Sequence, residues 1–263
     1  QTMLLKNFKT KLDGAGNTVV NGDAYFYFTA AKEGCGADIR SFTNAPAVRA
    51  GDTALFVPFA AMKAILACVH ADGSMAFDTD SNKFTAFRDL MHSSLQKNAV
   101  WQDLNNFDDD TLMKFHGASS SVPAIAQEKD LGDHVFSVSL QQKMNFTMLA
   151  PKEGRYLPYV NAQGFFTGPV RVTVAAGRVS IKPDASGQLA LSGRFDPSYV
   201  EKYHPEGDID WSRITPEAQK AFLQQGWTFA LPVYGVNPRV LLQATEGDLQ
   251  GTNFRLGFQV VRK

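Results

Sequence analysis

The sequence predicts an α+β protein built mostly on antiparallel β-sheet that contains both the N- and C-terminal strands, with a helical insertion around residues 58–117. Two observations predict this class. Apolar and polar residues alternate near both ends of the chain, and apolar residues recur at helical spacing between them. At 263 residues the chain is long for one domain. We expect a single domain over 1–263, with a possible subdivision into 1–122 and 123–263.

The N-terminal segment has the pattern of a β-hairpin. Leu4, Phe8 and Leu12 fall on alternate positions with polar residues between them. Turn-forming residues fill 14–17, and a dense aromatic run follows at 25–28. We expect two strands here, the second buried on both faces.

Helical spacing dominates the next part of the chain. Pro58 suits the first turn of a helix that ends near Asp72 and Gly73. A single apolar stripe over 84–95 predicts a second, amphipathic helix. Residues 111–116 favour one more short helix, because Gly117 supplies a typical C-terminal stop.

Acidic residues precede the second helix. Oxygen-bearing side chains at Asp78, Asp80 and Asn82 resemble the start of a calcium-binding loop. Lys83 stands where such loops carry glycine, so we expect these residues to cap a helix and assign no metal ligands.

β patterning returns after a loop at 117–123. Alternating runs separated by turn residues predict an antiparallel meander over residues 134–140, 170–181 and 189–195. Thr215 and Pro216 predict the start of a helix that stops at Gly226. Residues 239–245 and 253–261 then predict a C-terminal hairpin.

Composition limits the partners of the chain. The 26 basic residues balance 26 acidic ones, so no nucleic acid is expected as a partner of the whole chain. No apolar stretch is long enough to predict a transmembrane helix. The start at Gln1 favours removal of a signal peptide, so we expect an exported protein, periplasmic or extracellular. Cys35 and Cys68 fit one disulfide in that compartment, or two buried thiols.

Charge is unevenly distributed along this neutral chain. Residues 103–133 are acidic, whereas residues 152–200 and 218–263 are basic. This asymmetry predicts a basic sheet surface around Arg171, Arg178 and Arg194.

The densest polar segment is 203–211. The chain lacks the motifs of a phosphate-binding loop, a zinc protease and a serine-hydrolase elbow, and the cofactor, if any, is unknown. General acid–base catalysis on a sugar, or ligation of a metal, is chemistry that fits the polar residues of this segment, His204, Glu206, Asp208 and Asp210. Because the segment also contains proline and glycine, a solvated loop is the alternative.

A second candidate active site rests on scattered residues. Arg40 follows a predicted strand, helices come next, and Ser137 begins a Ser-Val-Ser strand. This order resembles bacterial ADP-ribosyltransferase toxins, which end on a Glu-x-Glu element. The resemblance implies a nicotinamide-glycosyl site built from Arg40, Ser137 and Glu206. The third element departs from the family pattern, because the nearest match carries Asp208 at its second acidic position.

We favour an exported soluble protein that acts by binding or assembly, with an unknown ligand or protein partner. The chain has no complete catalytic motif and is rich in Phe and Tyr. Aromatic side chains predicted as ligand contacts are Tyr25, Tyr27, Tyr203, Trp211 and Trp227. The alternative is a secreted enzyme, either a carboxylate-based hydrolase or an ADP-ribosyltransferase-like toxin.

Overall fold

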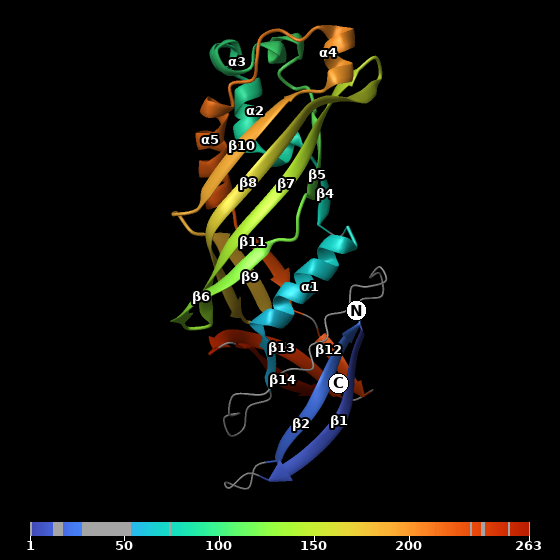
Figure 1. The fold of residues 1–263 in the computed structure, drawn as a ribbon, viewed down its shortest axis with the longest axis vertical. Coiled ribbons are helices and arrows are strands. Elements are labelled where there is room, and N and C mark those ends of the chain that lie inside the picture. Colours follow the sequence, from blue (N-terminus) through green and yellow to red (C-terminus); the bar gives the residue numbers. More distant parts are fainter. Residues whose placement is uncertain are drawn as a thin grey trace.

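A computed structural model describes residues 2–12, 18–27, 54–73, 75–231, 233–237, 240–251 and 253–262 (Figure 1). The strands are β1 Thr2–Leu12, β2 Thr18–Tyr27, β3 Ala54–Pro58, β4 Ala76–Asp80, β5 Lys114–Ser119, β6 Ala124–Gly132, β7 Val135–Lys152, β8 Arg155–Ala175, β9 Arg178–Pro183, β10 Gln188–Phe195, β11 Trp227–Ala230, β12 Val233–Asn237, β13 Val240–Gln250 and β14 Asn253–Arg262. The helices are α1 Phe59–Ala71, α2 Thr85–Met91, α3 Ser94–Val100, α4 Pro197–Tyr203 and α5 Trp211–Gln224, with 3₁₀ turns η1 Ser81–Lys83 and η2 Gln102–Asn106.

The predicted α+β class is confirmed. A twelve-stranded sheet follows the path β3-β14-β13-β8-β7-β5-β4, and its paired strands are antiparallel. Both ends of the chain are strands, as predicted. However, β1 pairs with β2 in a two-stranded sheet, while β14 lies in the large one. The predicted C-terminal hairpin is the pair β13–β14.

The hairpin β7–β8 lies at the centre of the large sheet, and its strands have 18 and 21 residues. Its turn, Glu153-Gly154, has φ angles of 54° and 74°, which suit the twist of a two-residue hairpin. On its other edge β8 pairs first with β10 and then with β9. Strands β9 and β10 therefore lie end to end along the same edge of β8. The predicted meander is wrong here, because it requires β10 to pair with β9.

The junction between β9 and β10, residues 183–187, explains the error. The backbone N–H of Asp184 donates to the carbonyl of Pro169 at 2.9 Å, so the chain stays on β8 instead of turning back. Two glycines allow the close approach. A Cβ added to Gly168 would lie 2.6 Å from the Cα of Gly187.

The helical insertion is confirmed, but the single helix predicted over 84–95 is two helices, α2 and α3, which meet at His92 and Ser93. The predicted helix at 111–116 is wrong because β5 occupies this segment. Phe115 is half-buried between two exposed neighbours, which is the two-residue period of a strand. A Cβ on Gly117 would lie 2.2 Å from the ring of Phe77, so the glycine allows Phe77 of β4 to cover the β5 backbone. Asp80 is a cap, as expected, although its side chain caps η1.

Helix α5 begins one turn earlier than predicted. The Asp210 side chain accepts a hydrogen bond from the backbone N–H of Ser212 at 3.0 Å, which starts the helix at Trp211. Pro216 consequently lies inside the helix instead of at its first position.

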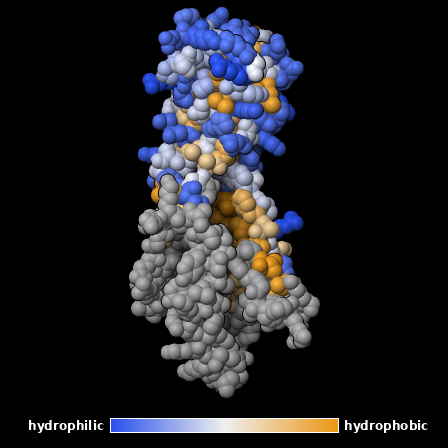
Figure 2. All heavy atoms as spheres, turned by 90° about the vertical axis from the view of Figure 1, so that its right-hand side faces the viewer, coloured by the Kyte–Doolittle hydropathy of each residue, from blue (hydrophilic) through white to orange (hydrophobic). Residues whose placement is uncertain are grey.

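Two hydrophobic cores lie along the long hairpin. One packs beneath α2, α3 and α4 and includes Trp101, Leu104 and Tyr159. The other lies between α1 and the C-terminal strands and includes Phe136 and Leu256. Figure 2 shows a largely hydrophilic surface over the upper body and an apolar area at the height of α1. Within the described ranges, no helix combines the length and hydropathy needed to cross a bilayer.

Candidate functional site

The polar segment 203–211 is a loop between α4 and α5. His204 ends α4 in the left-handed conformation, with φ 50° and ψ 64°. Asp210 caps α5, while Glu206 and Asp208 are exposed. Each of these residues thus has a local structural role or faces solvent.

A buried carboxylate fixes this loop in place. Asp103 on η2 is only 1% exposed. Its Oδ1 accepts the backbone N–H of Glu206 at 3.0 Å, and its Oδ2 accepts the hydroxyl of Tyr159 at 2.8 Å. The indole N–H of Trp101 donates to the same hydroxyl. Burial, and then the charge of Asp103, raise the pKa of Tyr159 far above its ordinary value, so the hydroxyl remains a donor.

The structure does not bring the predicted catalytic residues together. Ser137 is buried on β7 and pairs with Arg171 of β8. The backbone of Glu206 and the hydroxyl of Tyr159 on β8 both donate hydrogen bonds to the Asp103 carboxylate, so Glu206 lies near Tyr159. Arg171 and Tyr159 are twelve residues apart on one strand, which corresponds to about 40 Å along it. One nicotinamide-sized substrate cannot contact both ends. Arg40 lies outside the described residues.

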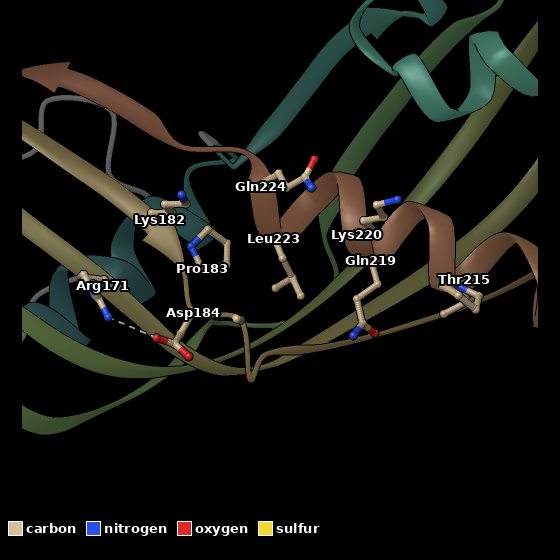
Figure 3. Close-up of a pocket in the computed structure, with 11 residues that line it drawn as sticks. Arg171, Lys182, Pro183, Asp184, Thr215, Gln219, Lys220, Leu223 and Gln224 are labelled. Carbon is tan, nitrogen blue, oxygen red and sulfur yellow. Dashed lines mark hydrogen bonds and ion pairs between the residues drawn. The ribbon is translucent and has the colours of Figure 1, made fainter.

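Two cavities flank α5. The smaller, of about 790 Å³, lies where α5 crosses the β9–β10 junction (Figure 3). The larger, of about 1200 Å³, lies between α5 and one face of the sheet, here called the inner face. Neither Asp208 nor Asp210 lines either of these two cavities, so neither cavity supplies a concave site for the carboxylate-based hydrolase.

The floor of the larger cavity follows the two-residue period of β8. Val160, Ala162, Gly164 and Phe166 point inward, and Leu140, Met144, Phe146 and Met148 of β7 continue this apolar floor. A Cβ on Gly164 would lie 2.8 Å from the ring of Phe146, so the glycine allows that ring to lie against the backbone. Gly164 therefore lets the Phe146 ring form part of the cavity floor against β8.

Helices form the roof and one end of the cavity. Ile214, Ala218, Ala221 and Phe222 come from α5, and α2 and α3 contribute further apolar side chains. The charged residues of the lining are all exposed and therefore belong to the rim, namely Asp78, Lys83, Arg213 and Glu217. Leu95 also lies at the rim and is 83% exposed. The interior is thus apolar and the mouth is polar with one exposed leucine.

All three tryptophans of the sequence line this cavity, Trp101, Trp211 and Trp227. The indole N–H of Trp211 donates to the carbonyl of Gly193 at 2.9 Å, so its polar atom is satisfied outside the cavity. Trp211 and Trp227 were among the predicted ligand contacts. Trp101 was not, because its place in the sequence indicates only a helical core position.

The other predicted contacts lie elsewhere. Tyr203 packs on Tyr199, with ring centroids 4.8 Å apart, and lines neither cavity. Tyr25 and Tyr27 are on β2, but their side chains fall outside the described part of the structure. The sequence signal that was missed is the run of small residues on the inner face of β8, at Ala162 and Gly164.

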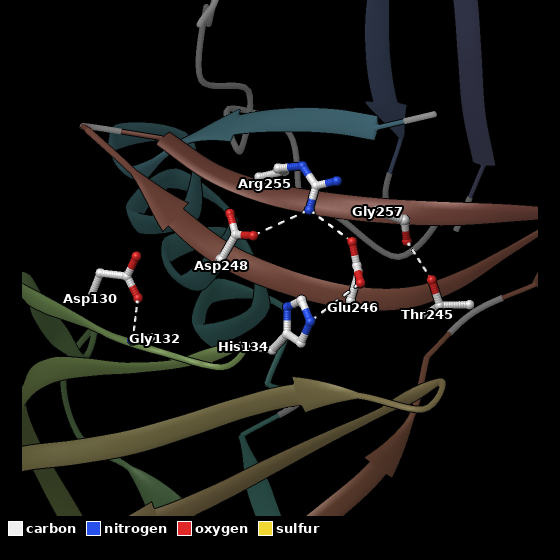
Figure 4. Close-up of polar contacts among 8 residues, drawn as sticks. All are labelled: Asp130, Gly132, His134, Thr245, Glu246, Asp248, Arg255 and Gly257. Atoms are coloured by element: carbon white, nitrogen blue, oxygen red, sulfur yellow. Dashed lines mark hydrogen bonds and ion pairs between the residues drawn. The ribbon is translucent and has the colours of Figure 1, made fainter. Parts of the chain in front are cut away.

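A second polar cluster joins the β6–β7 turn to the C-terminal hairpin (Figure 4). Arg255 is 6% exposed, and its Nη1 lies 3.0 Å from Glu246 Oε1 and 3.2 Å from Asp248 Oδ2. His134 Nε2 lies 3.3 Å from Glu246 Oε2. No cluster of His, Cys, Asp and Glu within the described ranges has the arrangement of a metal site. We therefore interpret this group as an ionic tie between strands.

No protein-family model matches the chain, and no curated protein matches its sequence. Among solved structures, the chain is similar to one described as "Crystal structure of lipopolysaccharide binding protein", with a TM-score of 0.37 and 10% sequence identity. The match covers 94% of this chain and 50% of that one, so this chain spans about half of that protein's length. A likeness at this level carries no argument about fold or function.

Proposed function

We propose that the protein binds a hydrophobic or amphipathic small molecule, of the class with an acyl chain, in the large cavity beneath α5. The single observation that carries the proposal is this cavity of about 1200 Å³ with an apolar interior. Ligand pockets are typically about 300–1,000 Å³ and mostly apolar. Apolar side chains that line a cavity gain many small dispersion contacts when an acyl chain packs against them.

The character of the lining supports recognition by shape and apolar contact. Gln142 is a polar residue of the lining, and its amide donates to Ser119 Oγ at 2.5 Å and to the Lys143 carbonyl at 3.0 Å. Its amide N–H donors are thus used by partners that do not line the cavity. Any polar end of the ligand would have to lie at the rim, where the charged side chains are. This favours binding over catalysis.

Export and a disulfide between Cys35 and Cys68 remain part of the proposal. Cys68 is 7% exposed in α1, and Cys35 lies outside the described residues. A non-reducing gel and thiol titration of the denatured protein would test the pairing.

Cavity-filling variants test the binding proposal. Ala162→Leu combined with Ala218→Leu adds bulk to the floor and the roof, since both alanines line the cavity. Ala190→Leu is the matched control, because Ala190 is exposed on the adjacent strand β10. The assay is titration with a fluorescent fatty acid. We expect saturable binding to the wild type and the control, and at least tenfold weaker binding to the double variant.

Two results would count against the function. One is that the wild type shows no saturable binding of the fluorescent fatty acid. The other is that the filled variant binds as tightly as the wild type while circular dichroism shows it to be folded.

A further inference from the structure

The smaller cavity at the β9–β10 junction has an excess of positive charge (Figure 3). We call it the basic notch. Its charged lining residues are Arg171, Lys182 and Lys220 against the single acid Asp184. In Figure 3, Arg171 points from β8 toward Asp184, while Lys182 and Lys220 come from β9 and α5. A net charge of about two positive units in one concavity stands out in a chain that is neutral as a whole.

Two of these cations face each other across strands. Arg171 and Lys182 are direct partners in the β8–β9 register. Cβ atoms of such partners are about 4.5–5.5 Å apart, and like charges at this spacing are destabilising. This arrangement favours an anion that interacts with both.

Asp184 neutralises only part of the positive charge of Arg171 and Lys182. Its Oδ2 lies 3.5 Å from Arg171 Nη2, at the long end of an ion pair. Its Oδ1 accepts both the backbone N–H and the hydroxyl of Ser186. The hydrogen bonds from Ser186, and then the charges of Arg171 and Lys129, hold the pKa of Asp184 below its ordinary value. Lys129 on β6 thus adds to the positive field here.

The two lysines of the notch have no such partner among the residues that the structure describes. Lys182 and Lys220 are exposed, and neither forms an ion pair there. Thr215, on the first half of α5, adds a hydroxyl to the lining. A guanidinium group, two ammonium groups and a hydroxyl are the donors that proteins use for phosphate.

We propose that the basic notch binds a phosphate group. Gln224 of α5 lines both the notch and the apolar cavity, so the two sites meet at this helix. The phosphate could therefore belong to the headgroup of an amphipathic ligand or to a free phosphorylated molecule. A phosphate that belongs to a ligand headgroup rests on the proposed function, because that ligand would also place its acyl chain in the apolar cavity. A free phosphorylated molecule would bind in the notch without any acyl chain.

Charge-removing variants test the notch. Lys182→Ala combined with Lys220→Ala removes two notch cations and leaves the Arg171–Asp184 pair intact. Arg155→Ala combined with Arg194→Ala is the matched control, since both arginines are exposed and neither lines the notch. Calorimetric titration with pyrophosphate at low ionic strength is the first measurement. We expect at least tenfold weaker binding by the notch variant and little change in the control.

A second measurement distinguishes the sources of the phosphate. Lysophosphatidate is compared with the monoacylglycerol of equal chain length in each protein. A preference for lysophosphatidate that the notch variant loses assigns the headgroup source. Pyrophosphate binding that the notch variant loses, without any such lipid preference, assigns a free phosphorylated molecule.

The proposal is overturned if the wild type binds neither phosphate probe. It is also overturned if the notch variant binds both probes as tightly as the wild type does. Failure of the proposed function looks different, because pyrophosphate would still bind while the fatty acid and the monoacylglycerol would not.

Discussion

Removal of the Asp103 carboxylate tests the view that the 203–211 loop is structural. Asp103→Ala deletes the acceptor of the Tyr159 hydroxyl, of the Glu206 backbone N–H and of the Asn106 side-chain amide. Tyr159 is fully buried, so its unpaired O–H costs about 1–3 kcal/mol. The other two bonds lie nearer to solvent and together contribute about 1 kcal/mol.

The free energy of unfolding should therefore fall by about 2–4 kcal/mol. For a chain of this size that corresponds to a loss of roughly 4–15 °C in the melting temperature. Urea unfolding followed by circular dichroism measures the change. Asp110→Ala is the control, because it removes an equal charge from an exposed position in the same part of the chain.

A double-mutant cycle isolates the buried bond. In a Tyr159→Phe background the Asp103→Ala change should cost about 1–3 kcal/mol less, since no hydroxyl is left unpaired. An Asp103→Ala protein as stable as the Asp110→Ala control would refute the structural role that we assign to Asp103.

Two further predictions concern the ionic cluster and the cap of α5. Arg255→Leu leaves Glu246 and Asp248 without their shared cation, so we expect urea unfolding to show a loss of about 2–4 kcal/mol. Gln259→Leu, exposed on the same strand, should change the value by less than about 0.5 kcal/mol. The hydrogen bond from the Ser212 side chain is the main cause that lowers the pKa of Asp210 below 3.8. This stabilisation is present above pH 3.8 and is lost as the pH falls through the lower pKa of the folded state. The difference between the urea midpoints of wild type and Asp210→Ala should therefore be largest at pH 6 and shrink as the solution is acidified.

The parts of the fold that the sequence predicts are those in which local pattern and long-range packing agree. The clean alternation from Phe254 onward became β14, and the apolar stripe that starts near Phe84 became α2 and α3. The predictions were wrong where a glycine allows close contact with residues that are distant in the sequence. Gly117, expected to end a helix, lies in strand β5, where its lack of a side chain leaves room for the ring of Phe77. The close approach of Gly168 and Gly187 lets β9 and β10 pair with the same edge of β8.

The candidate site was harder to predict because it is a cavity lined by apolar side chains from several strands and helices. Trp211 is prominent in the sequence as an aromatic residue, but the cavity lining also includes the small residues Ala162, Gly164 and Ala218. Small residues carry no reactive or charged group, so their spacing on β8 does not mark a site as charged residues do. The acidic loop carried a strong signal, yet its residues are explained by caps and by the buried Asp103.

The central claim is that an acyl chain binds inside the cavity that all three tryptophans line. Bromine atoms quench indole fluorescence only at short range, so titration with a brominated fatty acid reports where the chain lies. We predict saturable quenching by the brominated chain, none by its unbrominated counterpart, and restored fluorescence when the unbrominated chain competes. Displacement of the fluorescent fatty acid by the brominated chain without any tryptophan quenching would contradict the account.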